Sequence, residues 1–228
     1  MQKIRYELIE KYMLSCMEKD TAHDKEHIYR VLCSALDIAQ TEDDVNYDVL
    51  ICACLLHDIG RKEQLANPEF CHAQVGAEKA YQFLKEHDFE EKFCVHVRDC
   101  IQTHRFRKGN PPVSIEAQIL FDADKIDVSG AVGLARTIAY KGQNNEPFYT
   151  RREDGSISDG TNDVEVSFFQ EYKYKLEHIY DMFYTSRGAE IARKRQGAAA
   201  AFYNSMLEEI QSSYENGMEK LQEQFDAE

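Results

Sequence analysis

The stretch Val49-Leu50-Ile51-Cys52-Ala53-Cys54-Leu55-Leu56-His57-Asp58 decides the fold of this chain. Its eight consecutive apolar residues predict a buried segment, which we interpret as a core helix, and the run ends in two polar side chains. A buried imidazole and a buried carboxylate are costly unless another group satisfies them. The pair therefore predicts a polar site at the end of a core helix, and a divalent metal ion would satisfy it.

The overall charge restricts the chemistry that this chain can perform. It has 228 residues, of which 41 are acidic and 27 basic, for a formal net charge of −14 at pH 7. Such a field disfavours nucleic-acid binding and repels polyanions unless local cations or metal ions reverse it. We therefore expect no nucleic-acid partner, and any phosphate chemistry must be local.

Other features of the composition predict a cytoplasmic protein. No run of 18 apolar residues is present, so we expect no membrane span, and the charged N-terminal segment lacks the apolar core of a signal peptide. The seven cysteines are an odd number without framework spacing, which predicts reduced thiols.

Helical periodicity dominates the chain, and no segment alternates convincingly as a strand. We predict one all-α domain over 1–228, with a loop or lid at 141–163 and a helical extension at 164–228. The loop is rich in turn residues, and long loops are often functional. Thr41-x-x-Asp44 is expected to cap the helix of the apolar run. Predicted helices span about 3–18, 22–40, 46–58, 72–87, 90–106, 113–125, 127–141, 164–185 and 188–225.

Two further side chains can join His57 and Asp58 around one ion. His27 lies on the predicted helix 22–40, and Asp124 lies at the end of a later one. Nitrogen and oxygen ligands without thiolate suit Mn, Fe, Co, Ni, Zn or Mg, and helical bundles build such sites from inward-pointing side chains. This set would leave open positions for water and substrate.

His27 and Asp124 each have a competing candidate ligand nearby in the sequence. Asp122 is two residues before Asp124, but it should point to a different face of the helix. His23 precedes His27 by four residues, a spacing that can chelate a metal, but it falls in the capping segment.

Two more histidines are candidates for a second metal ion. His72 begins a predicted helix, and His104 lies near the end of another. If both turn inward, a second ion could lie beside the first with Asp58 as a bridge. Alternatively, either imidazole could simply hydrogen-bond a helix end.

Cations follow almost every proposed ligand, which is suggestive in so acidic a chain. Arginine and lysine bind phosphate oxygens well, so these residues are candidates for substrate binding. The alternative is that they balance neighbouring acids at the surface. The cations are Arg30, Arg61, Lys62, Arg105, Arg107, Lys108 and Lys125.

The four ligands in this order resemble the H…HD…D signature of the HD-domain superfamily of metal-dependent phosphohydrolases. The resemblance covers about residues 20–140, and a later run around 175–195 resembles the tail of small stand-alone bacterial members. It implies an all-α HD helical bundle with additional C-terminal helices, and the ligands His27, His57, Asp58 and Asp124. Some branches hold a second metal ion, and His72 and His104 fit those places.

The leading hypothesis is metal-dependent hydrolysis of a phosphoester or phosphoanhydride in a nucleotide, by a metal-activated water. Asp58, Lys62 and Asp127 are the candidate catalytic residues, with Asp127 orienting a ligand or moving a proton. Nearby cations would stabilise charge on phosphate oxygens. A small phosphorylated molecule is the expected partner, and exposed apolar residues in the last helices allow a homodimer.

Two alternatives remain open from the sequence. A few relatives of this fold use a six-ligand di-iron centre as oxygenases, and this would need both His72 and His104. The chain could also be a metal- or nucleotide-binding regulatory module without turnover.

Overall fold

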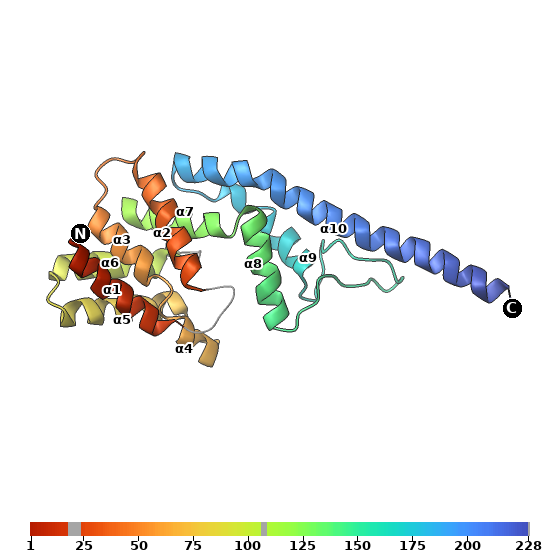
Figure 1. Ribbon diagram of the computed structural model, residues 1–228, viewed down its shortest axis with the longest axis horizontal. Coiled ribbons are helices and arrows are strands. Elements are labelled where there is room, and N and C mark those ends of the chain that lie inside the picture. The colour runs from red at the N-terminus through yellow and green to blue at the C-terminus, as the bar shows by residue number, and fades with distance from the viewer. Residues whose placement is uncertain (18–23, 106–108, 228) are drawn as a thin grey trace. The chain divides into compact units, whose positions relative to one another are not determined.

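The computed structural model describes residues 1–17, 24–105 and 109–227, and within these residues it contains helices and no β-strand (Figure 1). The all-α prediction is confirmed. The chain divides into two compact units. One comprises Met1–Asp127 with Met182–Ala192, and the other comprises Val128–Asp181 with Arg193–Glu228.

The first unit is a bundle of helices around the apolar run. Helix α3 carries this run, and seven of its residues from Val49 to Leu56 are buried, because α1, α2, α6 and α7 all contact it. The burial explains why this helix has apolar residues on all sides. The helices are α1 (Lys3–Cys16), α2 (Lys25–Ala39), α3 (Tyr47–Leu56), α4 (Arg61–Ala66), α5 (His72–Glu86), α6 (Glu91–Thr103) and α7 (Ile115–Asp127).

The cap expected for α3 was wrong. The helix begins after Asn46, whose side-chain oxygen accepts hydrogen bonds from the backbone N–H groups of Asp48 and Val49 at 3.2 Å. The Thr41 hydroxyl instead donates to the carbonyl oxygen of Ile38 in the last turn of α2. Both residues are good cap formers, so the sequence alone did not separate them.

The second unit contains α8 (Gly130–Gln143), α9 (Phe168–Glu171), a π-helical turn (Tyr172–Leu176) and a 3₁₀ turn (Ile179–Asp181). Most of the long helix α10 (Ser186–Asp226) also belongs to it. The predicted continuous helix over 164–185 is therefore wrong. Ser167 caps a helix that begins only at Phe168, by accepting a hydrogen bond from the N–H of Gln170.

The segment expected to be a loop folds back on itself within the second unit. The N–H of Ser158 donates to the carbonyl of Thr150, and the N–H of Arg152 donates to that of Ser156. At Gly160 φ is +88°, and a Cβ there would lie 2.2 Å from the carbonyl oxygen of Phe169. Glycine is therefore required at this turn. The role of the segment as a lid stays a prediction.

In the described part of the chain, no helix combines the length and apolar character needed to cross a membrane. The seven cysteines are free thiols, and Cys52 and Cys54 of the apolar run are buried. These two thiols fill the core as small apolar side chains do.

Candidate metal centre

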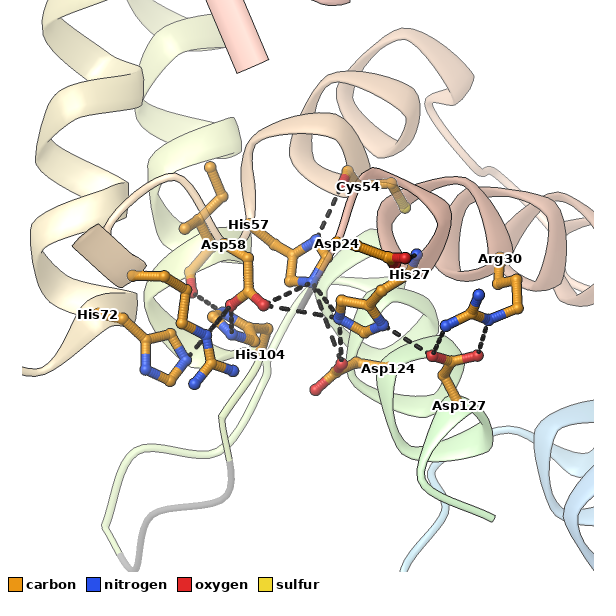
Figure 2. Close-up of polar contacts among 12 residues, drawn as sticks. Asp24, His27, Arg30, Cys54, His57, Asp58, His72, His104, Asp124 and Asp127 are labelled. Atoms are coloured by element: carbon orange, nitrogen blue, oxygen red, sulfur yellow. Dashed lines mark hydrogen bonds and ion pairs between the residues drawn. The ribbon is translucent and has the colours of Figure 1, made fainter. Parts of the chain in front are cut away.

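Four side chains from three places in the first unit converge (Figure 2). His27 comes from the first turn of α2, His57 and Asp58 from the end of α3, and Asp124 from the last turn of α7. The Nε2 atom of His27 lies 3.3 Å from Nε2 of His57 and 3.5 Å from both Asp58 Oδ2 and Asp124 Oδ1. His57 Nε2 lies 3.8 and 4.0 Å from the same two carboxylate oxygens.

These spacings suit one divalent ion. Ligand atoms about 2.1 Å from a shared ion stand roughly 3.0–3.5 Å apart when they are neighbours and about 4.2 Å apart when they are opposite, depending on the coordination geometry. The side chains of His27 and His57 are at most 1 % exposed, whereas that of Asp124 is 21 % exposed. The group is therefore buried on the imidazole side and reaches solvent at Asp124.

A second group of ligand atoms lies on the other side of Asp58. Its Oδ1 atom is 3.5 Å from Nε2 of His72 and 3.7 Å from Nε2 of His104. His27, His57 and Asp124 form one cluster that could hold a metal ion, and Asp58, His72 and His104 form another. The two oxygens of Asp58 thus face two different clusters.

The four imidazoles have the same tautomer. The Nδ1 atom of each faces an oxygen that can only accept, so Nδ1 carries a proton and, in the neutral ring, the Nε2 lone pair faces the site. A metal ion needs such a neutral imidazole. The Nδ1 partners are Asp127 Oδ2 for His27 (2.8 Å), Cys54 O for His57 (2.8 Å), Gln64 Oε1 for His72 (2.7 Å) and Ile101 O for His104 (2.6 Å).

The charges of the site are matched to a cation. Burial lowers the pKa of His57 to about 4 and keeps it neutral. Burial would raise the pKa of Asp58, but Arg61 and the nearby imidazoles outweigh this effect and hold that pKa well below its usual range. Among the described residues, no hydrogen-bond donor satisfies the buried Oδ2 of Asp58. A buried, ionised and unsatisfied oxygen is the donor that a metal ion would use.

Gly60 brings the two clusters together. A Cβ at this position would lie 2.3 Å from the carbonyl oxygen of His72 and 2.6 Å from the backbone nitrogen of Gly76. Only a glycine lets the turn after Asp58 approach the start of α5 so closely. The placement of His72 beside Asp58 therefore depends on this residue.

Asp127 does not touch the ligand atoms directly. Its Oδ2 atom accepts from Nδ1 of His27, and Arg30 donates to both of its oxygens, at 2.7 and 3.0 Å. This is the carboxylate–histidine arrangement that orients metal ligands. We therefore interpret Asp127 as a positioning residue, the first of the two roles that the sequence suggested.

Asp122 lies away from the clusters. Its carboxylate is fully buried and accepts the backbone N–H groups of Tyr184 and Thr185, and also the Thr185 hydroxyl at 2.7 Å. It therefore joins α7 to the residues before α10, within the same unit. The helical-face argument that separated it from Asp124 agrees with this placement.

The proposed cations differ in position. Arg61 donates from Nε to Asp58 Oδ1 at 3.0 Å. Arg105 lines a cavity of about 300 Å³ with Phe121 and Tyr184, among others, and the Lys125 ammonium lies over the Phe121 ring at 5.3 Å.

Lys62 lies on the exposed side of α4, and its catalytic role stays a prediction. His23, Arg107 and Lys108 lie outside the described residues.

The sequence did not single out Gly60 or Gln64. The only signal for Gly60 was a glycine in the turn that follows the apolar run and the polar pair. Gln64 is one polar residue on a six-residue helix that was not predicted, so nothing in the sequence separated it from its neighbours.

Comparisons with known proteins identify the domain in which this site lies. Residues 25–129 match the HD domain family model. YpgQ of Bacillus subtilis (strain 168), an uncharacterised protein, is 22% identical over 193 residues, which cover 85% of this chain and 87% of YpgQ. The segment that matches the HD domain family model contains all six clustered residues.

Solved structures show the same fold. YpgQ in complex with ADP aligns with a TM-score of 0.69 and 22% identity, covering 90% of this chain and 97% of that one. A predicted HD superfamily hydrolase from an uncultured Thermotogales bacterium aligns with a TM-score of 0.61 and 26% identity, covering 89% and 91%. The fold, the ordered cluster residues and the family match lead to one conclusion: residues 25–129 of this chain form an HD domain.

Proposed function

We propose that this protein is a divalent-metal-dependent phosphohydrolase that cleaves a phosphoester or phosphoanhydride bond of a nucleotide. The observation that carries the proposal is a convergence of two imidazoles and two carboxylates. The Nε2 atoms of His27 and His57 lie 3.3 Å apart, and each lies within 4.0 Å of an oxygen of both Asp58 and Asp124. His27, His57, Asp58 and Asp124 would hold the ion.

When bound, a divalent ion would polarise a water molecule and neutralise charge on phosphate oxygens. The protein's own residues prepare this site. Burial keeps the His57 imidazole neutral, hydrogen bonds at Nδ1 direct the Nε2 atoms inward, and Asp127 keeps the ring of His27 in place. Arg61, Arg105 and Lys125 supply positive charge near the ligand-bearing positions, which an anionic substrate needs in an acidic protein.

Two observations support a nucleotide as the substrate. The related YpgQ was solved with ADP bound. In this chain, the cavity beside Arg105 presents the rings of Phe121 and Tyr184, and these rings stand edge to face at 5.1 Å. A guanidinium beside aromatic rings suits a molecule with both phosphate and a planar base.

The test is a screen of nucleoside mono-, di- and triphosphates with Mn²⁺, Mg²⁺, Co²⁺ and Ni²⁺, with phosphate and pyrophosphate release as readouts. Asp58→Asn should abolish turnover, because one oxygen of Asp58 faces each cluster. The matched control is Asp99→Asn, which alters an exposed carboxylate paired with Arg98. Turnover by Asp58→Asn equal to that of the wild type would remove the proposal.

The assembly of all six ligands also keeps the oxygenase alternative testable. A di-iron centre would use both clusters with Asp58 as the bridge, and it would be revealed by two bound irons and by oxygen consumption. Activity that is unchanged without oxygen would exclude it. Tight nucleotide binding with no product under any metal would instead indicate a regulatory module.

A further inference from the structure

Arg61 occupies the oxygen that a second metal ion would need. It is the first residue of α4, and its Nε atom donates to Asp58 Oδ1 at 3.0 Å. The Nε2 atoms of His72 and His104 face the same oxygen from 3.5 and 3.7 Å. The guanidinium group of Arg61 therefore binds the same carboxylate oxygen that the second cluster offers to a metal ion.

The two clusters also differ in charge. The first has the carboxylate of Asp124 to itself and shares that of Asp58, whose Oδ2 lacks a hydrogen-bond donor among the described residues. Among the described residues, the second has two imidazoles and the shared carboxylate, and Arg61 already neutralises that carboxylate. A divalent ion there would meet a positive charge without a carboxylate of its own to offset it.

Local geometry holds Arg61 in this position. It follows Gly60 directly, and a Cβ at Gly60 would lie only 2.3 Å from the carbonyl oxygen of His72. The position of the Arg61 backbone is thus fixed relative to Asp58 and His72. The Arg61 side chain is 29 % exposed, so part of it also faces solvent.

We propose that Arg61 is the resident cation of the second cluster. The site then takes one divalent ion tightly, at His27, His57, Asp124 and Asp58 Oδ2, and takes a second ion only weakly, in competition with Arg61. This inference rests on the proposed function for the metal site itself, but it concerns the number of ions and does not depend on the substrate.

The test is a Mn²⁺ titration of the metal-free full-length protein, by calorimetry and by electron paramagnetic resonance, which detects coupling between adjacent Mn²⁺ ions. The wild type should bind one ion tightly and show no coupled pair at micromolar metal. Arg61→Gln should tighten binding of a second ion about tenfold or more and produce the coupled signal. Arg61→Lys keeps the charge and should stay close to the wild type.

Controls assign the effect to the second cluster. Arg98→Gln removes a surface arginine paired with Asp99 and should change neither ion. His104→Ala should leave the tight ion of the wild type in place, and in the Arg61→Gln background it should abolish the gain. Circular dichroism of each variant reports whether it is folded. If Arg61→Gln does not fold, His104→Ala in the wild-type background still tests the proposal.

Three results would overturn the proposal: two equally tight ions in the wild type, an unchanged second ion in folded Arg61→Gln, or loss of the tight ion in folded His104→Ala. A wild type that binds no divalent ion would defeat the proposed function as well. One tight ion without nucleotide hydrolysis would defeat only the proposed function.

Discussion

The two clusters that share Asp58 contain similar ligand atoms but have different surroundings. On one side, His27 is held by the carboxylate of Asp127, and Asp124 adds a charge of its own. On the other, His72 is held by the neutral amide of Gln64, and Arg61 brings positive charge. The comparison teaches that a set of ligands does not determine how many ions bind, because the groups around them set the charge that an ion meets.

The largest expected effect comes from removing the carboxylate that only the first cluster owns. Asp124→Asn should lose the tight ion and lower kcat/KM by more than about 100-fold. This exceeds the usual effect of changing a residue that only hydrogen-bonds a metal ligand. Bound Mn²⁺ after gel filtration and steady-state kinetics measure the two losses. If Asp124→Asn retains a full equivalent of metal, the first cluster is not the tight site.

Gly60→Ala should act mainly on the second cluster, because the added Cβ would press against the carbonyl of His72. We expect a loss of about 1–3 kcal/mol in the free energy of unfolding, measured by urea denaturation of the metal-free protein. The control is Gly142→Ala, because nothing lies within 4 Å of a Cβ at that position. Equal stability of the two variants would contradict the close approach at Gly60.

Asp127→Asn should weaken binding of the tight ion by about 10- to 100-fold, since the ring of His27 loses its charged partner. A Mn²⁺ titration measures the change, and Asp127→Glu should restore part of the affinity by restoring the carboxylate. An unchanged dissociation constant in Asp127→Asn would mean that this carboxylate does not position His27.

The smallest effect on metal binding is expected for Gln64, which holds His72 as Asp127 holds His27. Gln64→Ala should change the dissociation constant of the tight ion by less than about threefold, below the usual range for partners of metal-ligating histidines. The same titration measures it. A loss as large as that of Asp127→Asn would show that the two clusters act as one unit and would remove the distinction drawn above.

The sequence predicted the core of the site because that part depends on local patterns. The apolar run ending at His57 indicated both a buried helix and a polar group that needs a partner. Helical geometry separated Asp124 from Asp122, since residues two apart point to different sides of a helix. Residue types, order and spacing were sufficient there.

What the sequence did not predict depends on contacts between distant segments. The predicted helix over 164–185 is broken, and the last two of its residues donate their N–H groups to Asp122, 62 residues or more earlier in the chain. Similarly, the requirement for Gly60 comes from the backbone of α5, and the partnership of Gln64 with His72 comes from the placement of a short helix. None of these contacts leaves a periodic signal in the sequence.

The hydrogen bonds of Asp122 also bear on where the protein can be divided. The segment that matches the family ends at residue 129, yet the buried carboxylate on α7 obtains its donors from Tyr184 and Thr185. A fragment cut at the family boundary would leave that carboxylate without them, a few ångströms along the helix from Asp124. The first unit therefore draws on residues well beyond the segment that matches the family, and a shortened version of it should keep Met182–Ala192.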